Sequence, residues 1–340
     1  MRRGYASGGV QPTHAATADD DIRGCRARGS GGKELVEAPP DKARMYTGTT
    51  GLRERVLRMA RRLTIGAVLA LAFAIGIYYA FRVASVAGSQ LFFNSGWMLV
   101  LLAPFAGILA AGVTKRHDPV IEGDRVLRHD DAAMLEHWTH GVGTVALLVS
   151  GIALGTFFTP VLVSGGAPVW AWMNVHFVAV IVFLFGSFYW GANTLLSQKR
   201  FSEHLPTKNA IAFTVQHYGH LLGIKKYSMP PEDKYFESER TAFLLALASG
   251  VLIIVTGGLK VAAHVVGLPA GLMGVTTITH DVAAVAMLVF FVAHVLFAAI
   301  LPASWPVLRS MFTGYVTTEQ AQKEFAGWYR RLTNSGNAPE

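Results

Sequence analysis

Hydrophobic residues in this 340-residue chain gather into six long runs that carry almost no charge. The runs cover approximately residues 63–81, 95–113, 134–159, 169–196, 241–266 and 276–301. A bilayer core about 30 Å thick is crossed by roughly 20 apolar residues in a helix. Because each run has about this length, the pattern predicts an all-α integral membrane protein with six transmembrane helices.

The distribution of basic residues predicts the orientation of these helices. The formal net charge is +8, a value that nucleic-acid binding would also explain. However, Lys and Arg crowd before the first run, between the second and third, between the fourth and fifth, and after the sixth, and they are rare in the other connections. Basic loops stay in the cytoplasm. The charge therefore predicts both termini in the cytoplasm and argues against a nucleic-acid partner.

Three parts follow from this pattern. Residues 1–50 are rich in Gly, Ala, Arg and Asp without apolar periodicity, and are expected to form a disordered cytoplasmic tail. Residues 51–118 hold the first two runs as an N-terminal transmembrane hairpin without histidine, and residues 119–335 hold the other four, with a cytoplasmic connection at 197–240. The one cysteine, Cys25, excludes covalently attached haem and cysteine-bound metal clusters.

Histidine inside the predicted spans is the candidate chemistry of the chain. A polar ring is costly in a bilayer unless it has a partner, and histidine is the usual axial ligand of haem iron. His280 and His294 lie fourteen residues apart on the sixth run. In a helix this spacing is roughly 21 Å along the axis and about 40° short of four turns. Both rings are therefore expected on one face, at opposite depths.

Two further histidines match these depths. His137 opens the third run on the cytoplasmic side, level with His294, and His176 opens the fourth run on the opposite side, level with His280. The pairs predict a four-helix bundle that holds two b-type haems, each bound through iron by two histidines. A flat macrocycle also needs small residues on the ligand face. Such residues share a stripe with His137 at Gly141, Thr144, Gly151 and Gly155.

Other interpretations of these residues stay open. A single histidine within a span can equally form a hydrogen-bonded contact between helices, and His140 is a rival ligand because it lies on a face next to that of His137. A six-helix transporter or a passive anchor without haem would also fit the hydropathy. The spans lack buried carboxylates at mid-depth and show no pair of Gly/Pro-broken helices in corresponding halves, two features that transport sites often display. In the connection 197–240, His217 and His220 are candidate proton carriers.

Five segments carry a resemblance to a known family. They are EHWTHGVGTVALLVSG at 136–151, MNVHF at 173–177, DKYFESERTAF at 233–243, HDVAAVAMLVFFVAH at 280–294 and MFTGYVTTEQAQKEFAGWYR at 311–330. In order and spacing they resemble the gamma, or cytochrome b, subunit of respiratory formate dehydrogenase. The resemblance covers about residues 128–331, and the two N-terminal helices lie outside it. It implies the same haem ligands: His137 with His294, and His176 with His280.

The resemblance also implies a function and partners. The chain would be the membrane subunit of formate dehydrogenase in a bacterial inner membrane. It would take electrons from a periplasmic iron–sulfur subunit, itself supplied by a molybdenum or tungsten catalytic subunit, and deliver them to quinone on the cytoplasmic side. Related cytochrome b subunits serve hydrogenase and thiosulfate reductase, which are the rival complexes. Formate oxidation itself would take place on another subunit.

The quinone site implied by the resemblance lies beside His294, near Tyr235 to Glu239. Glu237, Glu239 and His220 are candidates for proton delivery to the quinone. In this region the chain has Phe236, Glu237 and Ser238 where the family commonly has Asn and, soon afterwards, Gly. The predicted quinone contacts therefore depart from the family pattern.

Overall fold

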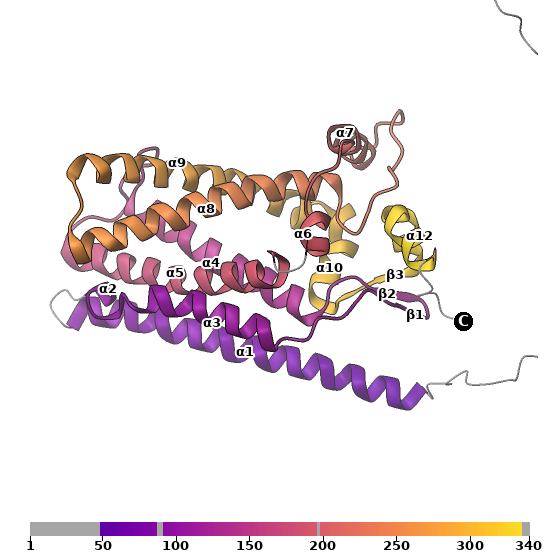
Figure 1. Ribbon diagram of the computed structural model, residues 1–340, viewed down its shortest axis with the longest axis horizontal. Helices are drawn as coiled ribbons and strands as arrows, with labels where there is room; N and C mark the ends of the chain where they lie inside the picture. Colours follow the sequence, from indigo (N-terminus) through magenta and orange to yellow (C-terminus); the bar gives the residue numbers. More distant parts are fainter. Residues whose placement is uncertain (1–47, 87–90, 196–197, 335–340) are drawn as a thin grey trace, which may run out of the picture. The chain divides into compact units, whose positions relative to one another are not determined.

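A computed structural model describes residues 48–86, 91–195 and 198–334 of the chain. Most of the predicted tail, residues 1–50, lies outside the described residues. The long helices, shown in Figure 1, are α1 (Gly48–Val86), α3 (Leu99–Val113), α4 (Asp131–Leu154), α5 (Gly166–Leu195), α8 (Glu237–Val266) and α9 (Ala270–Val295). A short helix, α2 (Phe92–Gly96), precedes α3. The described part of the chain is thus predominantly helical, as its sequence predicts.

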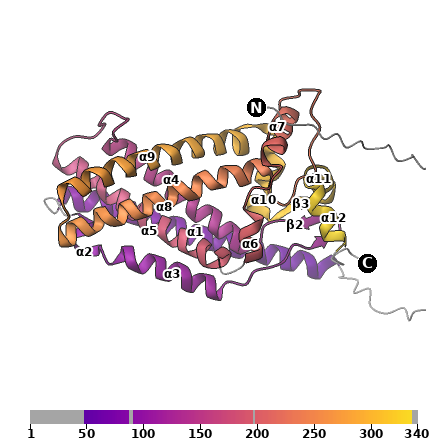
Figure 2. The ribbon, with the colours of Figure 1, turned by 45° about the horizontal axis from the view of Figure 1, so that its top comes forward.

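Two helical hairpins form the centre of the fold. Helix α4 packs along α5, and α8 packs along α9, while backbone contacts between the two hairpins are sparse. Figure 2 shows α8 and α9 running side by side. Glycines allow α4 and α5 to approach closely. A methyl group added at Gly143 would lie 3.0 Å from the backbone nitrogen of Phe183, and one at Gly186 would lie 2.8 Å from the hydroxyl of Thr139.

The N-terminal helices pack on the outer side of α5. Both α1 and α3 contact this helix, and Gly107 of α3 faces the backbone of Phe185. Asn174 of α5 is 1% exposed. Its side chain accepts a hydrogen bond of 2.8 Å from the backbone N–H of Phe92 and donates one of 3.4 Å to the carbonyl of Ala80. A single buried amide therefore joins α1 and the start of α2 to the bundle.

Four helical segments are long and apolar enough to cross a membrane: Arg62–Val83, Gly166–Leu195, Glu237–Val266 and Ala270–Ile300. They confirm four of the six predicted spans. The other two predictions fall on α3, which has 15 residues, and on α4, which has 24. At 1.5 Å per residue α4 is about 36 Å long, enough to span, but His137 and His140 lower its hydropathy. The spans at α3 and α4 stay predictions.

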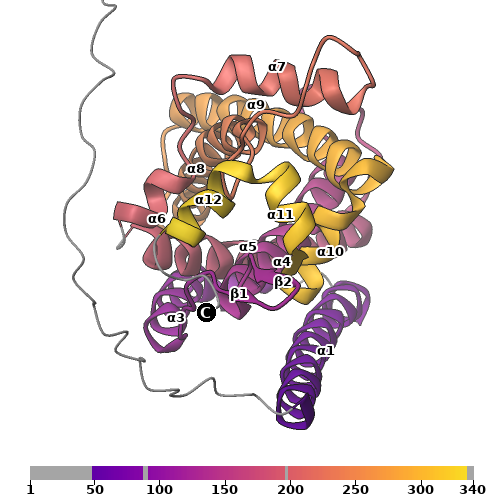
Figure 3. The same cartoon turned by 90° about the vertical axis from the view of Figure 1, so that its right-hand side faces the viewer.

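One end of the bundle carries a folded unit that we call the cap. It contains α6 (Gln198–Glu203), α7 (Ala210–Leu221), η1 (Leu296–Ile300), η2 (Pro302–Ser304), α10 (Trp305–Thr313), α11 (Thr318–Glu324) and α12 (Ala326–Asn334), with strands β1 (Ile121–Glu122), β2 (Arg125–Leu127) and β3 (Tyr315–Thr317). Figure 3 views the molecule from this end. It shows α10, α11 and α12 over the centre and α7 beside α8 and α9.

The three-stranded antiparallel sheet of the cap is absent from the sequence prediction. Its strand order is β1-β2-β3, with Val126 paired to Val316. Gly123 has φ +62° in the two-residue turn between β1 and β2, a conformation that glycine adopts without strain. The strands are only two or three residues long, too short for a recognisable alternation of polar and apolar residues. They join the segment before α4 to the segment after α10.

Arg128 is the polar centre of the cap. It is 3% exposed, and its Nε and Nη2 donate hydrogen bonds of 3.1 and 2.9 Å to the carbonyl oxygen of Lys234. The guanidinium also lies 4.4 Å from the ring centre of Phe325 and 3.4 Å from a carboxylate oxygen of Glu239. One side chain thus ties β2 to the start of α8 and to α11.

We expect Arg128→Leu to destabilise the protein by about 2–3 kcal/mol, because the carbonyl of Lys234 loses its donor and the carboxylate of Glu239 keeps only the backbone N–H of Phe236. The measurement is thermal unfolding in detergent, together with the rate of limited proteolysis within the cap. Arg125→Leu is the matched control, since that side chain is 41% exposed and its substitution should cost less than about 0.5 kcal/mol. Equal losses in the two variants would contradict this role of Arg128.

Candidate functional site

His176 of α5 is held by a hydroxyl of the neighbouring helix. Its Nδ1 lies 2.8 Å from Oγ of Ser150 on α4. That hydroxyl donates its own proton back to the carbonyl of Ala146, at 2.6 Å. Since the hydroxyl proton is already used, we assign the proton of the imidazole to Nδ1, which then donates to Ser150. The Nε2 atom of His176 is left with a free lone pair.

The same arrangement recurs in the other hairpin. Nδ1 of His280 on α9 lies 2.8 Å from Oγ1 of Thr256 on α8, and this hydroxyl donates to the carbonyl of Leu252 at 2.6 Å. A glycine follows each hydroxyl residue: a methyl group at Gly151 would lie 4.0 Å from Cε1 of His176, and one at Gly257 would lie 3.7 Å from Cε1 of His280. Each hairpin therefore supplies one histidine with its own anchor.

The anchored rings are suited to binding a metal. Among the described residues, neither Nε2 has a hydrogen-bond partner, and the two side chains lie within electrostatic range of each other. A histidine ligand normally donates its other ring N–H to an oxygen, which fixes the tautomer and the orientation of the ring. His176 and His280 meet this condition before any metal binds.

His137 and His294 come together at the cap end. The ring centroids are 6.0 Å apart, with 57° between the planes. A transition metal bonds an imidazole nitrogen at about 2 Å, so two imidazoles on opposite sides of one ion have centroids roughly 6 Å apart. The spacing thus fits two histidines that would together hold one iron. Trp138 stands edge-on to His137, and Phe290 stacks on His294, so both rings are held by aromatic neighbours.

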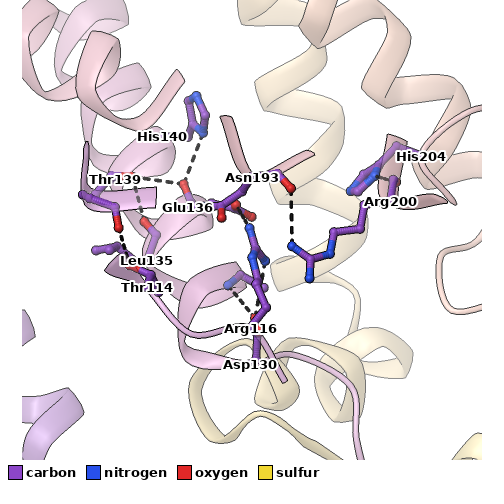
Figure 4. A network of polar contacts seen from close by, with 12 residues as sticks. Thr114, Arg116, Asp130, Leu135, Glu136, Thr139, His140, Asn193, Arg200 and His204 are labelled. Atoms are coloured by element: carbon purple, nitrogen blue, oxygen red, sulfur yellow. Dashed lines mark hydrogen bonds and ion pairs between the residues drawn. The ribbon is translucent and has the colours of Figure 1, made fainter. Parts of the chain in front are cut away.

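His140 has a different environment from His137. Its Nε2 lies 3.0 Å from Oγ of Ser187 on α5, and its Nδ1 lies 3.2 Å from the backbone carbonyl of Glu136. Figure 4 shows this ring above Glu136. Both nitrogens are therefore occupied by hydrogen bonds within the α4–α5 hairpin. This geometry favours His137 over His140 as the ligand.

Charged side chains hold the start of α4 in place. Asp130 accepts a hydrogen bond of 2.9 Å from the backbone N–H of Ala133 and so caps the helix. Arg116 pairs with Glu136 and lies 3.5 Å from Asp130, as Figure 4 shows. This pairing fixes the turn that precedes His137 against the segment after α3.

The residues that were predicted to bind quinone or to deliver protons lie in different parts of the structure. Glu239, in the first turn of α8, lies within electrostatic range of His294, and the ring of Tyr235 packs against that of His204 with centroids 4.8 Å apart and planes tilted by 31°. Glu237 is buried and engaged with Arg240, while His220 is on the exposed face of α7. The structure therefore brings Glu239 toward His294, and it places His220 on the surface.

Sequence reasoning missed Glu232, whose side chain is fully buried in the cap. Its Oε2 accepts a hydrogen bond of 3.0 Å from the backbone N–H of Glu237, and its Oε1 has no partner. The available signal was an acid directly after Pro230 and Pro231, just before a helix. This pattern does not indicate that Glu232 is buried, because the residues that cover it belong to α12, which begins 94 residues later.

The histidines of the site come in pairs and not in larger clusters. Within residues 48–86, 91–195 and 198–334, no group of three or more His, Cys, Asp or Glu side chains is arranged to hold one. A protein site for a bare ion usually needs at least three side-chain ligands. Histidines in pairs are instead the donor set that a haem iron takes above and below its ring.

A comparison with protein families finds a match over the region that contains these histidines. A family model described as prokaryotic cytochrome b561 matches residues 128–314, more than half of the chain. The matched region runs from Arg128 to Gly314 and contains both hairpins with all four paired histidines. No curated protein matches the chain.

We expect Ser150→Ala and Thr256→Val to release the rings of His176 and His280, because each loses the acceptor of its Nδ1 proton. Loss of such a partner typically weakens metal binding about 10- to 100-fold. The purified variants should therefore hold less b-haem, measured by pyridine haemochrome, and should show a shifted haem midpoint potential.

Ser249→Ala is the matched control for these two variants. Ser249 is equally buried on α8, and its hydroxyl bonds only to carbonyls of its own helix, Leu245 and Ala246. Haem content and potential should stay at their wild-type values in this variant. If Ser249→Ala had the same effect as Thr256→Val, the anchoring role would be wrong.

Proposed function

The chain belongs to the prokaryotic cytochrome b561 family, and from this we propose that it is the membrane subunit of a formate dehydrogenase complex that delivers electrons to quinone. The coarser part of this statement follows from the family and from the apolar helices. The chain is a multi-pass membrane cytochrome b that transfers electrons, and its family binds b-type haem. The donor, the acceptor and the number of haems are the proposal.

The proposal rests on the two pairs of histidines, which lie at two levels of one bundle. His280 and His294 both lie on the continuous helix α9, fourteen residues apart, which is roughly 21 Å along the axis. His176 would hold one haem with His280, and His137 the other with His294. Each haem, when bound, supplies one-electron redox chemistry. Two levels of ligands extend electron transfer from one end of the bundle to the other.

The chain's own residues orient the ligands. Ser150 and Thr256 keep the proton of each ring on Nδ1, so that Nε2 of His176 and His280 stays available as a donor atom. At the cap end, the aromatic rings of Trp138 and Phe290 restrict the rings of His137 and His294. Backbone contacts between the hairpins are sparse, and His137 with His294 and His176 with His280 lie near each other across them.

The choice of formate dehydrogenase rests on the cap. Two of the resembling segments, residues 233–243 and 311–330, lie far apart in sequence and pack together in this unit. Phe236 stacks on Phe325 with centroids 4.8 Å apart and planes at 16°. Asp233 pairs with Arg331, which directly follows the second segment. The residues that carry the resemblance therefore build one structural unit beside His294.

Quinone would be reduced at this end, near Tyr235 and Glu239, with protons taken up from the same side. By the distribution of basic residues this side is the cytoplasm, and an iron–sulfur partner subunit would bind at the opposite, periplasmic end. An electron that moves inward against the membrane potential stores about 2.3 kcal/mol per 100 mV for a full crossing. The direction of transfer would thus conserve energy from formate oxidation.

Histidine variants test the haem assignment. We expect about two b-haems per wild-type chain and the loss of one of them in each of His137→Ala, His176→Ala, His280→Ala and His294→Ala. The spectrum that remains should be the same for His137→Ala and His294→Ala, and the same for His176→Ala and His280→Ala. His140→Ala is the control and should keep both haems. Loss of both haems in this control, or a chain without haem, would overturn the assignment.

The electron donor is tested in membranes that contain the assembled complex. We expect formate to reduce the b-haem, and an added quinone to reoxidise it, in reduced-minus-oxidised spectra. Hydrogen should not reduce it, and thiosulfate should not oxidise it. Reduction by hydrogen instead of formate would assign the chain to a hydrogenase complex. Oxidation by thiosulfate would assign it to a thiosulfate reductase.

A further inference from the structure

A pocket of 220 Å³ lies between the cap and the first turn of α8. It lies between the segment that leads into α7, the segment that leads into α8, and α12. Its wall includes Lys208, Asn209, Glu232, Arg240 and Arg331. The wall also includes the acids Asp233 and Glu237, so that three carboxyl groups and three basic groups line the pocket.

Glu232 is the innermost carboxyl of this wall. Its backbone is fixed, because its carbonyl oxygen accepts hydrogen bonds from the N–H groups of Gly327 and Trp328, at 2.9 and 3.3 Å. Its Oε1 is buried without a hydrogen-bond partner. The nearest group is Nδ1 of His217 on α7, at 4.0 Å, and this nitrogen is also buried without a partner. Two proton-binding atoms therefore face each other across a distance that one water molecule or a small side-chain movement would bridge.

The neighbouring acids form ion pairs with arginine side chains, whereas Glu232 does not. Glu237 lies 3.4 Å from Arg240 and also accepts the backbone N–H of Thr207 at 2.9 Å. Asp233 lies 3.0 Å from Arg240 and pairs with Arg331. Within the described cap, Glu232 has no cation within ion-pair distance except the ring of His217, should that ring carry a proton.

Burial and neighbouring charges decide when the pair holds a proton. Burial raises the pKa of Glu232 to about 7, the charges of Glu237 and Glu239 act in the same direction, and Arg240 opposes them. Burial lowers the pKa of His217 to about 4, and His220 adds to this effect. Near neutral pH the carboxyl therefore gains and loses a proton, while the imidazole stays neutral and can accept one briefly.

The pair also lies next to the helix end that carries His294. His217 packs on Phe236, the residue before α8, with ring centroids 4.4 Å apart. Its neighbour Tyr218 packs on Phe297 of η1 at 4.5 Å, three residues after His294. Glu232 thus borders the pocket, and its neighbour His217 belongs to α7, the helix that contacts the region of His294.

We propose that Glu232 and His217 form a proton-loading site that takes protons from the pocket and passes them toward a quinone near Tyr235 and Glu239. This inference rests on the proposed function. A proton from water in the pocket binds the Glu232 carboxylate, moves to Nδ1 of His217, and leaves from Nε2 of the same ring. Reduction of one quinone takes two electrons, from the donor subunit, and two protons, so the pair loads twice per quinol and ends in its starting state.

Infrared spectroscopy of the purified protein, without donor or quinone, tests the loading step. We expect a carbonyl band of a protonated carboxyl that disappears as the pH rises through about 7. The difference spectrum between wild type and Glu232→Gln, a substitution that keeps the size of the side chain, should contain this band, and the corresponding difference spectrum for Glu319→Gln, the control at an exposed acid of α11, should not. A Glu232→Gln difference spectrum without the band overturns the proposal.

Quinone reduction tests the transfer step. In Glu232→Gln and His217→Gln, the rate of haem reoxidation by quinone should fall at least about tenfold, with haem content and spectrum unchanged. The wild-type rate should fall as the pH rises above the pKa of Glu232, and this dependence should be lost in Glu232→Gln. Unchanged rates in both variants overturn the relay. A titrating Glu232 band in a protein that no quinone oxidises would instead count against the proposed function.

Discussion

A polar ring buried among apolar helices needs a hydrogen-bond partner, and the arrangement of α4, α5, α8 and α9 depends on meeting that need. His176 and His280 receive their partners from within their own hairpins, at Ser150 and Thr256. Each hydroxyl returns its proton to its own helix, so it can only accept from the ring. This directionality fixes the tautomer, and the tautomer leaves Nε2 as the atom that can bind iron. The pairing of helices and the chemistry of the site thus share one cause.

The levels of the paired histidines could be predicted because helical geometry relates sequence spacing to depth. Fourteen residues between His280 and His294 define two levels, and the ends of the third and fourth runs lie at those levels. The structure brings His137 and His294 together, as this arithmetic expects. The anchors could not be predicted in the same way, because contact between Ser150 and His176 depends on the rotation of two helices about their axes. Gly151 was recognised as one of a stripe of small residues, and its neighbour Ser150 was not.

The cap could not be predicted from the sequence, because its stability is tertiary. One apolar cluster contains Val126, Val316, Phe325 and Trp328, although Val126 and Trp328 are 202 positions apart in the sequence. By the charge pattern Arg128 is one of several basic residues between the second and third runs, yet it is 3% exposed and bonded to the carbonyl of Lys234. The rule for basic loops describes the average of a segment. It does not identify the one cation whose hydrogen bonds hold the segment in place.

The two buried charge systems of the cap differ in a way that bears on function. Arg128 is surrounded by acceptors and an aromatic ring, which compensate the loss of hydration. Glu232 has a single hydrogen bond and a partner at 4.0 Å, so its ionised form is poorly compensated. A glutamine would make the same bond to the N–H of Glu237 without that cost. Stability therefore does not explain an acid at this position, whereas a group that must bind and release a proton near neutral pH does.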